Sequence, residues 1–188
     1  MTKNIKRSVF SENIQFFNRG DDFMPVTVRN FEEKDAPRIA EIMYESFKSV
    51  FKERWGSENK DNGDCWKEHV KKSTPEKIQV IFVAEDEGKV IGFLHVSADV
   101  KWGLGVLHCI GVDPNCFARG VGKAMAAEAE RLWQEKRMRK VYTCTSHINQ
   151  RALAFYKSLG FEEEGLLKSH FFEGIDEIQL AKFYTYND

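Results

Sequence analysis

The order of predicted strands and helices changes near the middle of this chain, and that change limits the folds open to it. Before residue 112, two β-rich runs at 78–85 and 90–100 are joined by Asp86-Glu87-Gly88-Lys89, which predicts an antiparallel hairpin. After residue 112, strand and helix patterns alternate, which predicts parallel pairing there. The alternating elements are a helix at 120–136, a strand at 141–145 and a helix at 149–158. We therefore expect a mixed α/β sheet.

The remaining periodic segments complete a single predicted domain over residues 25–188. Apolar residues at helical spacing follow Asp35 and Pro37, which predicts a helix that runs to about Phe51. The other segments are a helix at 64–72 and strands at 26–29, 106–112, 161–168 and 177–186. The expected fold is a mixed, mostly antiparallel central sheet of about seven strands, flanked by about four helices.

Residues 1–24 differ from the rest of the chain. They mix basic and aromatic residues without a clear period and end at Gly20-Asp21-Asp22. We interpret them as an amino-terminal arm outside the domain. Such an arm is either a mobile extension or a segment whose aromatic residues cover a partner or pack back on the fold, and the pattern leaves these alternatives open.

Charge and cysteine content exclude several classes of protein. The 28 basic and 29 acidic side chains leave a formal net charge of −1, so no overall field draws the chain to nucleic acid or to an anionic membrane. The four cysteines form no CxxC pair, which gives no support to a disulfide framework or a zinc site. No apolar run reaches the roughly 18 residues of a membrane span, and the start of the chain does not resemble a signal peptide. We expect a cytoplasmic protein without a metal.

A glycine-rich loop follows the strand predicted at 106–112. Gly120-Val121-Gly122 opens the next helix, where glycines allow a ligand to approach the backbone closely. The first N–H groups of a helix have no partner within it, and the helix dipole favours an anion at that end. Arg119 and Lys123 add positive charge. The segment matches neither a Walker loop nor GxGxxG, and taken by itself it favours a plain tight turn.

A second segment favours the ligand-binding interpretation of the glycine loop over the tight turn. Its sequence is Asn149-Gln-Arg-Ala152-Leu-Ala-Phe-Tyr156-Lys-Ser-Leu-Gly160-Phe161. Asn149 lies where a helix cap is preferred and Gly160 lies where a helix ends. Together with Val112-x-Pro114 and Gly120-x-Gly122, this segment resembles the GNAT superfamily of N-acetyltransferases. The resemblance extends in element order from about Val26 to Tyr186.

The resemblance implies a fold and an activity. In this superfamily an enzyme transfers the acetyl group of acetyl-CoA to a primary amine by direct attack in a ternary complex. The end of a splayed strand, here Ile110, Gly111 and Val112, binds the pantetheine arm and the acetyl carbonyl. The loop that holds the pyrophosphate matches Ala118, Arg119, Gly120, Val121, Gly122 and Lys123. The resemblance also brings Asn149, Ala152 and Tyr156 to the cofactor, and it implies that the Tyr156 phenol protonates the departing thiolate.

Two positions depart from the pattern of the superfamily. Phe117 occupies the first loop position, which is usually Gln or Arg, so we expect Arg119 to supply the basic group instead. The strand at 106–112 lacks the glutamate that many relatives use as a base. His108 is the available candidate, as in the arylalkylamine branch, although a lone histidine in an apolar strand is often a packed side chain. An ordered water is the alternative base.

The acceptor amine is left open by the sequence. The resemblance implies that segments 47–63 and 169–176 choose the acceptor. Both mix aromatic residues with carboxylates, with Glu53 and Trp55 in the first, Phe172 and Glu173 in the second, and Glu177 just after it. Such a surface suits a cationic amine, although a solvated charged face is an equal interpretation. Peptide amino termini and small amines both remain candidates. A non-catalytic module that binds acetyl-CoA or a protein partner is the rival function, and a homodimer is left open.

Overall fold

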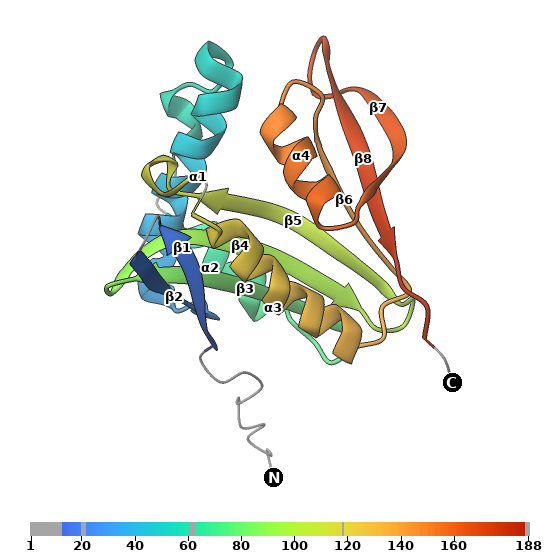
Figure 1. Ribbon diagram of the computed structural model, residues 1–188. Coiled ribbons are helices and arrows are strands. Elements are labelled where there is room, and N and C mark those ends of the chain that lie inside the picture. The colour runs from blue at the N-terminus through green and yellow to red at the C-terminus, as the bar shows by residue number, and fades with distance from the viewer. Residues whose placement is uncertain (1–12, 20–21, 61–62, 118, 187–188) are drawn as a thin grey trace.

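The computed structural model describes residues 13–19, 22–60, 63–117 and 119–186, which form one sheet with helices on both faces (Figure 1). The strands are β1 Asn13–Arg19, β2 Asp22–Asn30, β3 Lys77–Asp86, β4 Lys89–Asp99, β5 Leu104–Val112, β6 Lys140–Ser146, β7 Glu162–Phe172 and β8 Ile175–Phe183. The α-helices are α1 Ala36–Phe51, α2 Asp64–Lys71, α3 Val121–Glu135 and α4 Gln150–Ser158. Short 3₁₀ turns cover Glu33–Asp35, Lys52–Arg54, Ser57–Asn59 and Pro114–Cys116.

The mixed sheet predicted from the sequence is confirmed, with one strand more than the seven expected. Its order is β1-β2-β3-β4-β5-β6-β8-β7, and every neighbouring pair except β5 and β6 is antiparallel. The additional strand, β1, lies within the predicted arm 1–24 and pairs with β2 along its whole length. Residues 1–12 of that arm lie outside the described residues, and the boundary between arm and domain stays a prediction.

Parallel pairing is less extensive than the alternation after residue 112 predicted. β5 and β6 are parallel, as expected for strands connected by a helix. β7 and β8, however, form a hairpin whose turn places Gly174 at φ 75°. The second strand of that hairpin, β8, pairs with β6, so β7 lies at the outer edge of the sheet.

Two apolar cores lie on the two faces of the sheet. On one face, α3 and α4 contribute buried side chains such as Met125, Trp133 and Leu153 to a cluster that includes Phe82. On the other face, α1 and α2 contribute Ile39, Ile42 and Trp66, which pack with Ile81, Val83 and Phe93. Because successive residues of a strand point to opposite faces, β3 supplies both cores. The sheet is therefore held from both sides.

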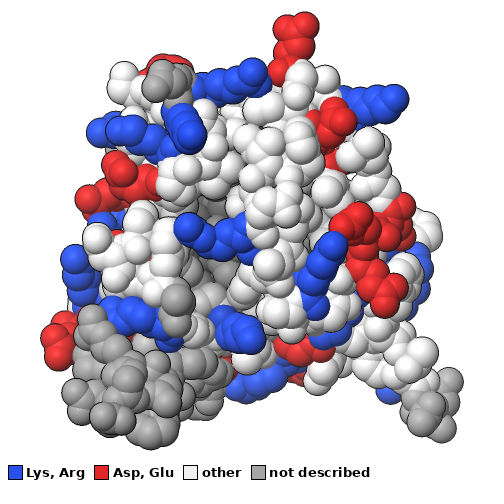
Figure 2. All heavy atoms as spheres, turned by 45° about the horizontal axis from the view of Figure 1, so that its top comes forward, with Lys and Arg blue, Asp and Glu red and all other residues white. Residues whose placement is uncertain are grey.

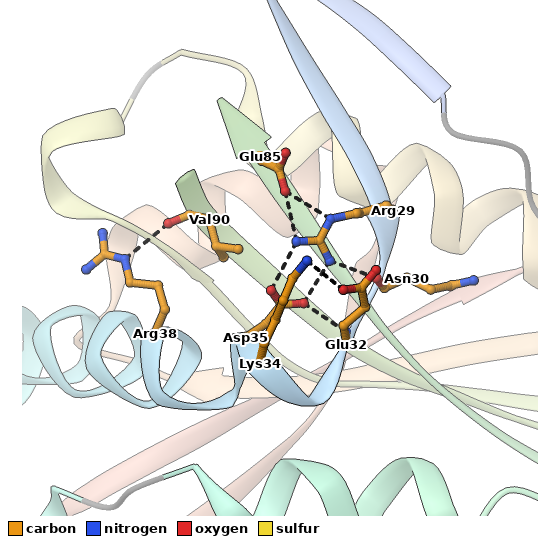
Figure 3. A network of polar contacts seen from close by, with 8 residues as sticks. All are labelled: Arg29, Asn30, Glu32, Lys34, Asp35, Arg38, Glu85 and Val90. Atoms are coloured by element: carbon orange, nitrogen blue, oxygen red, sulfur yellow. Dashed lines mark hydrogen bonds and ion pairs between the residues drawn. The ribbon is translucent and has the colours of Figure 1, made fainter. Parts of the chain in front are cut away.

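A network of ion pairs ties the start of α1 to β2 and β3 (Figure 3). The Arg29 guanidinium donates to both carboxylate oxygens of Asp35, at 2.7 and 3.0 Å, and to Glu85 Oε2 at 2.8 Å. Burial alone would raise the pKa of Asp35, but the hydrogen bonds and charge of Arg29 lower it below its ordinary value. A buried carboxylate paired in this way fixes the orientation of the helix.

The same helix is also tied to the end of β5. Arg38 donates to the Val90 carbonyl at 3.1 Å and forms an ion pair with Asp113, the residue that follows β5. Ser46 Oγ donates to the Val112 carbonyl at 3.2 Å. These contacts hold α1 beside the loop that leads from β5 to α3.

Candidate active site

β5 and β6 separate soon after they meet, which opens a wedge in the sheet (Figure 1). They pair only at Leu104–Val106 with Lys140–Tyr142. Beyond that point β5 pairs with β4 alone up to Val112. Among the described residues, the edge of β5 that faces β6 therefore presents backbone N–H and C=O groups without a strand partner. An extended ligand can add to such an edge as another strand would.

His108 marks an irregularity in β5 at the place where the wedge opens. In the β4–β5 ladder, His95 pairs with Cys109 and Val96 pairs with Leu107, so His108 is the additional residue of a β-bulge. A bulge bends its strand and increases the local twist. Beyond the bulge, a Cβ at Gly111 would lie 2.4 Å from Phe93, so the strand passes too close to that ring for a larger residue.

The glycine loop leads into a helix that the sequence predicted. Gly120 has φ 79°, a left-handed conformation that glycine adopts without strain, and α3 begins at Val121. Ala124 N–H is the first to bond within the helix, to the Gly120 carbonyl at 3.0 Å. The amides of Val121, Gly122 and Lys123 precede it, and Gly120 has no side chain to cap them. Ala118, another predicted cofactor residue, lies outside the described residues.

The basic groups around this loop are arranged differently from the expectation. Arg119, the predicted basic contributor, directs its guanidinium to Asp86 Oδ2 at 3.5 Å and to Cys116 Sγ at 3.2 Å. Arg151, in the first turn of α4, places its guanidinium 4.1 Å from the centre of the Phe117 ring. Sequence reasoning missed Arg151 because its relation to Phe117 depends on how α4 and the loop are packed. A positive group thus lies beside the position that departs from the family pattern.

Tyr156 lies between the two strands of the wedge. The residue is only 5% exposed, and its hydroxyl lies near the side chain of Thr143 on β6. Burial raises the pKa of Tyr156 above its ordinary value, and the nearby thiols Cys109 on β5 and Cys144 on β6 raise it further. The phenol therefore stays protonated at neutral pH, as a proton donor must.

Asn149 caps the helix that carries Tyr156, as its position predicted. Its side-chain oxygen accepts a hydrogen bond from Ala152 N–H at 3.2 Å. This contact brings two of the predicted cofactor residues together at the start of α4. The cap holds the amino-terminal end of α4, and with it Arg151, at the entrance of the wedge.

The candidate base His108 is exposed on one side and packed on the other. Its ring stacks on the buried His95 with centroids 4.5 Å apart, and its Nε2 lies 2.7 Å from Ser97 Oγ. Burial and the charge of His69 lower the pKa of His108 below 6.5. Burial lowers the pKa of His95 to about 3, so that ring stays neutral beside it. His108 is therefore neutral at pH 7 and able to accept a proton.

Glu177 is a titratable group near the wedge whose character the sequence did not reveal. It is 3% exposed, and its Oε1 has no hydrogen-bond partner among the described residues. Burial raises the pKa of Glu177 to about 7, and its charge raises the pKa of Cys144. Glu177 pairs across the sheet with Ser146, the last residue of β6. The sequence placed it only at the start of the strand predicted at 177–186, next to the acceptor segment, because the burial of a single carboxylate cannot be read from the sequence pattern.

A groove of about 690 Å³ opens at the entrance of the wedge, and we call it the mouth groove. It is lined by residues 49–52 and 54 at the end of α1, by residues 148–151 at the start of α4, and by Ile175. Figure 2 turns this end of the molecule toward the viewer and shows Lys and Arg side chains beside a hollow. The charged residues of the lining are Lys52, Arg54 and Arg151, whereas the sequence had led us to expect carboxylates beside aromatic residues.

Contacts across the mouth groove join α1 to the β7–β8 hairpin. Phe51 packs on Phe172 with ring centroids 4.9 Å apart, and Arg54 donates to the Glu173 carbonyl at 3.2 Å. The aromatic part of the expected acceptor surface is therefore present. Both segments that were expected to choose the acceptor, 47–63 and 169–176, meet at this wall.

Some classes of site have no support in the described part of the chain. Among the described residues, none of the four cysteines forms a disulfide. Among the described residues, no group of three or more His, Cys, Asp or Glu side chains is placed to hold a metal ion. In the same residues, no helix has the length and apolar character needed to cross a membrane.

Comparison with known proteins agrees with this geometry. A family model for the acetyltransferase (GNAT) family matches residues 40–161, which include α1, the wedge strands, the glycine loop and α4. The chain belongs to this family. A ribosomal-protein-alanine N-acetyltransferase from Brucella melitensis superposes with a TM-score of 0.67, covering 84% of this chain and 99% of that one at 22% identity. A likeness at this identity supports the fold alone.

Curated relatives match parts of longer proteins. An uncharacterized N-acetyltransferase of Methanocaldococcus jannaschii is 28% identical over 76% of this chain and 63% of its own length. A mycothiol acetyltransferase of Segniliparus rotundus is 34% identical over 43% of this chain and 32% of its own length. The chain thus spans less than two thirds of these relatives, and their activities come to it only as proposals.

Proposed function

We propose that this protein transfers the acetyl group of acetyl-CoA to a primary amine by direct attack in a ternary complex. Membership of the acetyltransferase (GNAT) family supports acetyl transfer in general. The observation that carries the proposal is the unpaired edge of β5, which runs from His108 to the loop before α3. The Tyr156 hydroxyl lies near Cys109 on β5, and the amides of the first turn of α3 lie beyond the end of that strand.

The residues along β5 and at the starts of α3 and α4 offer groups that suit acetyl-CoA, the acetyl donor. The edge at Ile110, Gly111 and Val112 offers backbone groups to the amides of the pantetheine arm, although Ser46 already occupies the Val112 carbonyl. The amides of Val121, Gly122 and Lys123 suit the pyrophosphate, since they lie in the first turn of α3 at the positive end of the helix dipole. Arg151 and Lys123 supply the positive charge that Phe117 does not. Asn149 and Ala152 frame the arm at the start of α4.

The acid and base are separated along the wedge. His108 takes one proton from the ammonium form of the acceptor, and the freed amine attacks the acetyl carbonyl carbon. This requires the tautomer in which Nε2–H donates to Ser97 Oγ and Nδ1 keeps its lone pair. The carbon–sulfur bond breaks, Tyr156 gives its proton to the sulfur, and the second proton of the amine nitrogen restores the phenol through solvent. General acid and base groups each contribute about 10²- to 10⁴-fold.

Thermal unfolding with and without acetyl-CoA tests the binding step, with ATP as the phosphate control. At about 100 times its dissociation constant, a ligand adds about 2.7 kcal/mol of stability, or about 5 to 10 °C for a chain of this size. Thiol release with a panel of amines then tests the transfer. A shift with acetyl-CoA but no thiol release with any amine would favour the rival function, a binding module with Phe117 in its loop. No shift at millimolar acetyl-CoA would refute both.

A further inference from the structure

The charged residues that line the mouth groove all have the same sign. They are Lys52, Arg54 and Arg151, and all three are basic. Among the described side chains, none of the three forms an ion pair with a carboxylate, whereas Arg29 and Arg38 on the neighbouring elements do. Unpaired positive charge along a concave surface attracts an anion.

The three basic groups lie at two separate places. Arg151 lies over Phe117, next to the loop before α3, where the phosphates of the donor are expected. Lys52 and Arg54 lie on the opposite wall, where α1 ends and Arg54 contacts the turn of the β7–β8 hairpin. The first place belongs to the donor, so the second faces the other ligand, the acceptor.

The wall with Lys52 and Arg54 is held in one arrangement. Lys52 has φ 50°, which is uncommon for a residue other than glycine and persists only where the surroundings impose it. The Phe51 ring on one side of Lys52 packs on Phe172, and the Trp55 ring beyond Arg54 packs on Phe47 at 4.9 Å. Basic groups that are fixed before binding lose less entropy when they bind.

We propose that Lys52 and Arg54 select an acceptor that carries a carboxylate as well as its primary amine, as a free apolar amino acid does. This inference rests on the proposed function. A volume of about 690 Å³ suits a small molecule, and Phe51, Ile148 and Ile175 offer apolar surface to its side chain. An Arg fork recognises a carboxylate with two hydrogen bonds. A polyamine or a basic peptide terminus would instead be repelled.

Matched pairs of acceptors provide the test. We would measure kcat/KM by thiol release for phenylalanine against phenethylamine and for leucine against 3-methylbutylamine, which differ only in the carboxylate. The wild type should prefer the amino acid, and Arg54→Gln or Lys52→Gln should reduce that preference about 10- to 100-fold, as expected when a hydrogen bond to a charged group is lost. The loss should be mainly in KM. Activity with the plain amines, which carry no carboxylate and are cations at neutral pH, should not fall.

Lys48→Gln is the matched control. Lys48 is an exposed residue of α1 that does not line the mouth groove, and its substitution removes the same charge. It should leave the preference unchanged. If the plain amines or a peptide amino terminus are acetylated as well as the amino acids, and Arg54→Gln changes nothing, the inference is wrong although the proposed function stands. If acetyl-CoA neither shifts the melting temperature nor releases thiol with any acceptor, the proposed function fails and this inference fails with it.

Discussion

Glu177 links the electrostatics of the wedge to the stability of the fold. Its carboxyl is buried at the end of β6 and near the start of β8, with no hydrogen-bond partner for Oε1 among the described residues. Burial raises the pKa of Glu177 from 4.5 to about 7, and the charge of His147 offsets only part of this effect. A rise of that size corresponds to about 3 kcal/mol of unfolding free energy, lost when the carboxyl ionises in the folded protein. The substitution that tests this is Glu177→Gln.

The direction of the pH dependence of stability follows from the pKa of Glu177 in the unfolded chain and in the folded protein. Between 4.5 and about 7 the unfolded chain releases the proton that the folded protein retains. The stability that comes with the protonated carboxyl is therefore complete below pH 4.5 and is lost as the pH rises through 7. Between pH 5 and pH 8 the loss is on the order of 2 to 3 kcal/mol for this pair of values. The titratable groups that contact Glu177 electrostatically are Cys144 on β6 and His147 in the loop before α4.

The assay is urea or thermal unfolding of the wild type and Glu177→Gln at pH 5 and at pH 8. A glutamine does not titrate, so the variant should gain on the order of 2 to 3 kcal/mol relative to the wild type between the two pH values, or about 5 to 10 °C. Taking the difference between pH values removes any constant cost of packing the amide. Glu162→Gln, an exposed residue of β7, is the control and should show no such gain. Equal pH dependence in the wild type and Glu177→Gln would refute the reasoning.

Three further predictions concern the wedge. Tyr156→Phe should lower kcat about 10²-fold or more and change acetyl-CoA affinity little, and an unchanged kcat would remove the phenol from the mechanism. His108→Gln should lower kcat/KM most strongly below pH 8, and the difference from the wild type should shrink as the pH approaches the pKa of the acceptor amine. A difference that does not change with pH would reject His108 as the base. Arg151→Gln should weaken acetyl-CoA binding about 10-fold in a thermal-shift titration at nearly unchanged kcat, whereas Lys157→Gln at the other end of α4 should not.

The sequence predicted the secondary structure well where the local signals agree. The hairpin at Asp86-Glu87-Gly88-Lys89, the helix opened by Gly120 and the cap at Asn149 all combine a periodic run with a residue that starts or ends it. β1 was missed because Asn13–Arg19 shows no clean alternation of apolar and polar residues. Its strand conformation comes with its pairing to β2, which is a contact between segments and not a local preference.

The sequence motifs predicted which positions along the chain form the candidate site. The positions of Gly120, Asn149 and Tyr156 follow from their spacing along the chain, and all three lie around the wedge. The partners of charged side chains do not follow from spacing. Arg119 and Arg151 differ in what they contact, because Asp86 comes from the β3–β4 turn and Phe117 from the loop before α3. Only packing decides which of the two cations is left for a phosphate.

The bulge at His108 connects the shape of the wedge with its proposed chemistry. An additional residue in β5 increases the local twist, and β5 and β6 part just before it. The same irregularity brings the His108 ring onto His95 and next to Ser97, where its pKa is lowered and one nitrogen is occupied. Deleting the bulge would therefore change both the separation of β5 from β6 and the surroundings of His108. A regular β5 would also turn the residues after it to the opposite face of the sheet. A base placed by a bulge is in this way tied to the strand edge that would hold the donor.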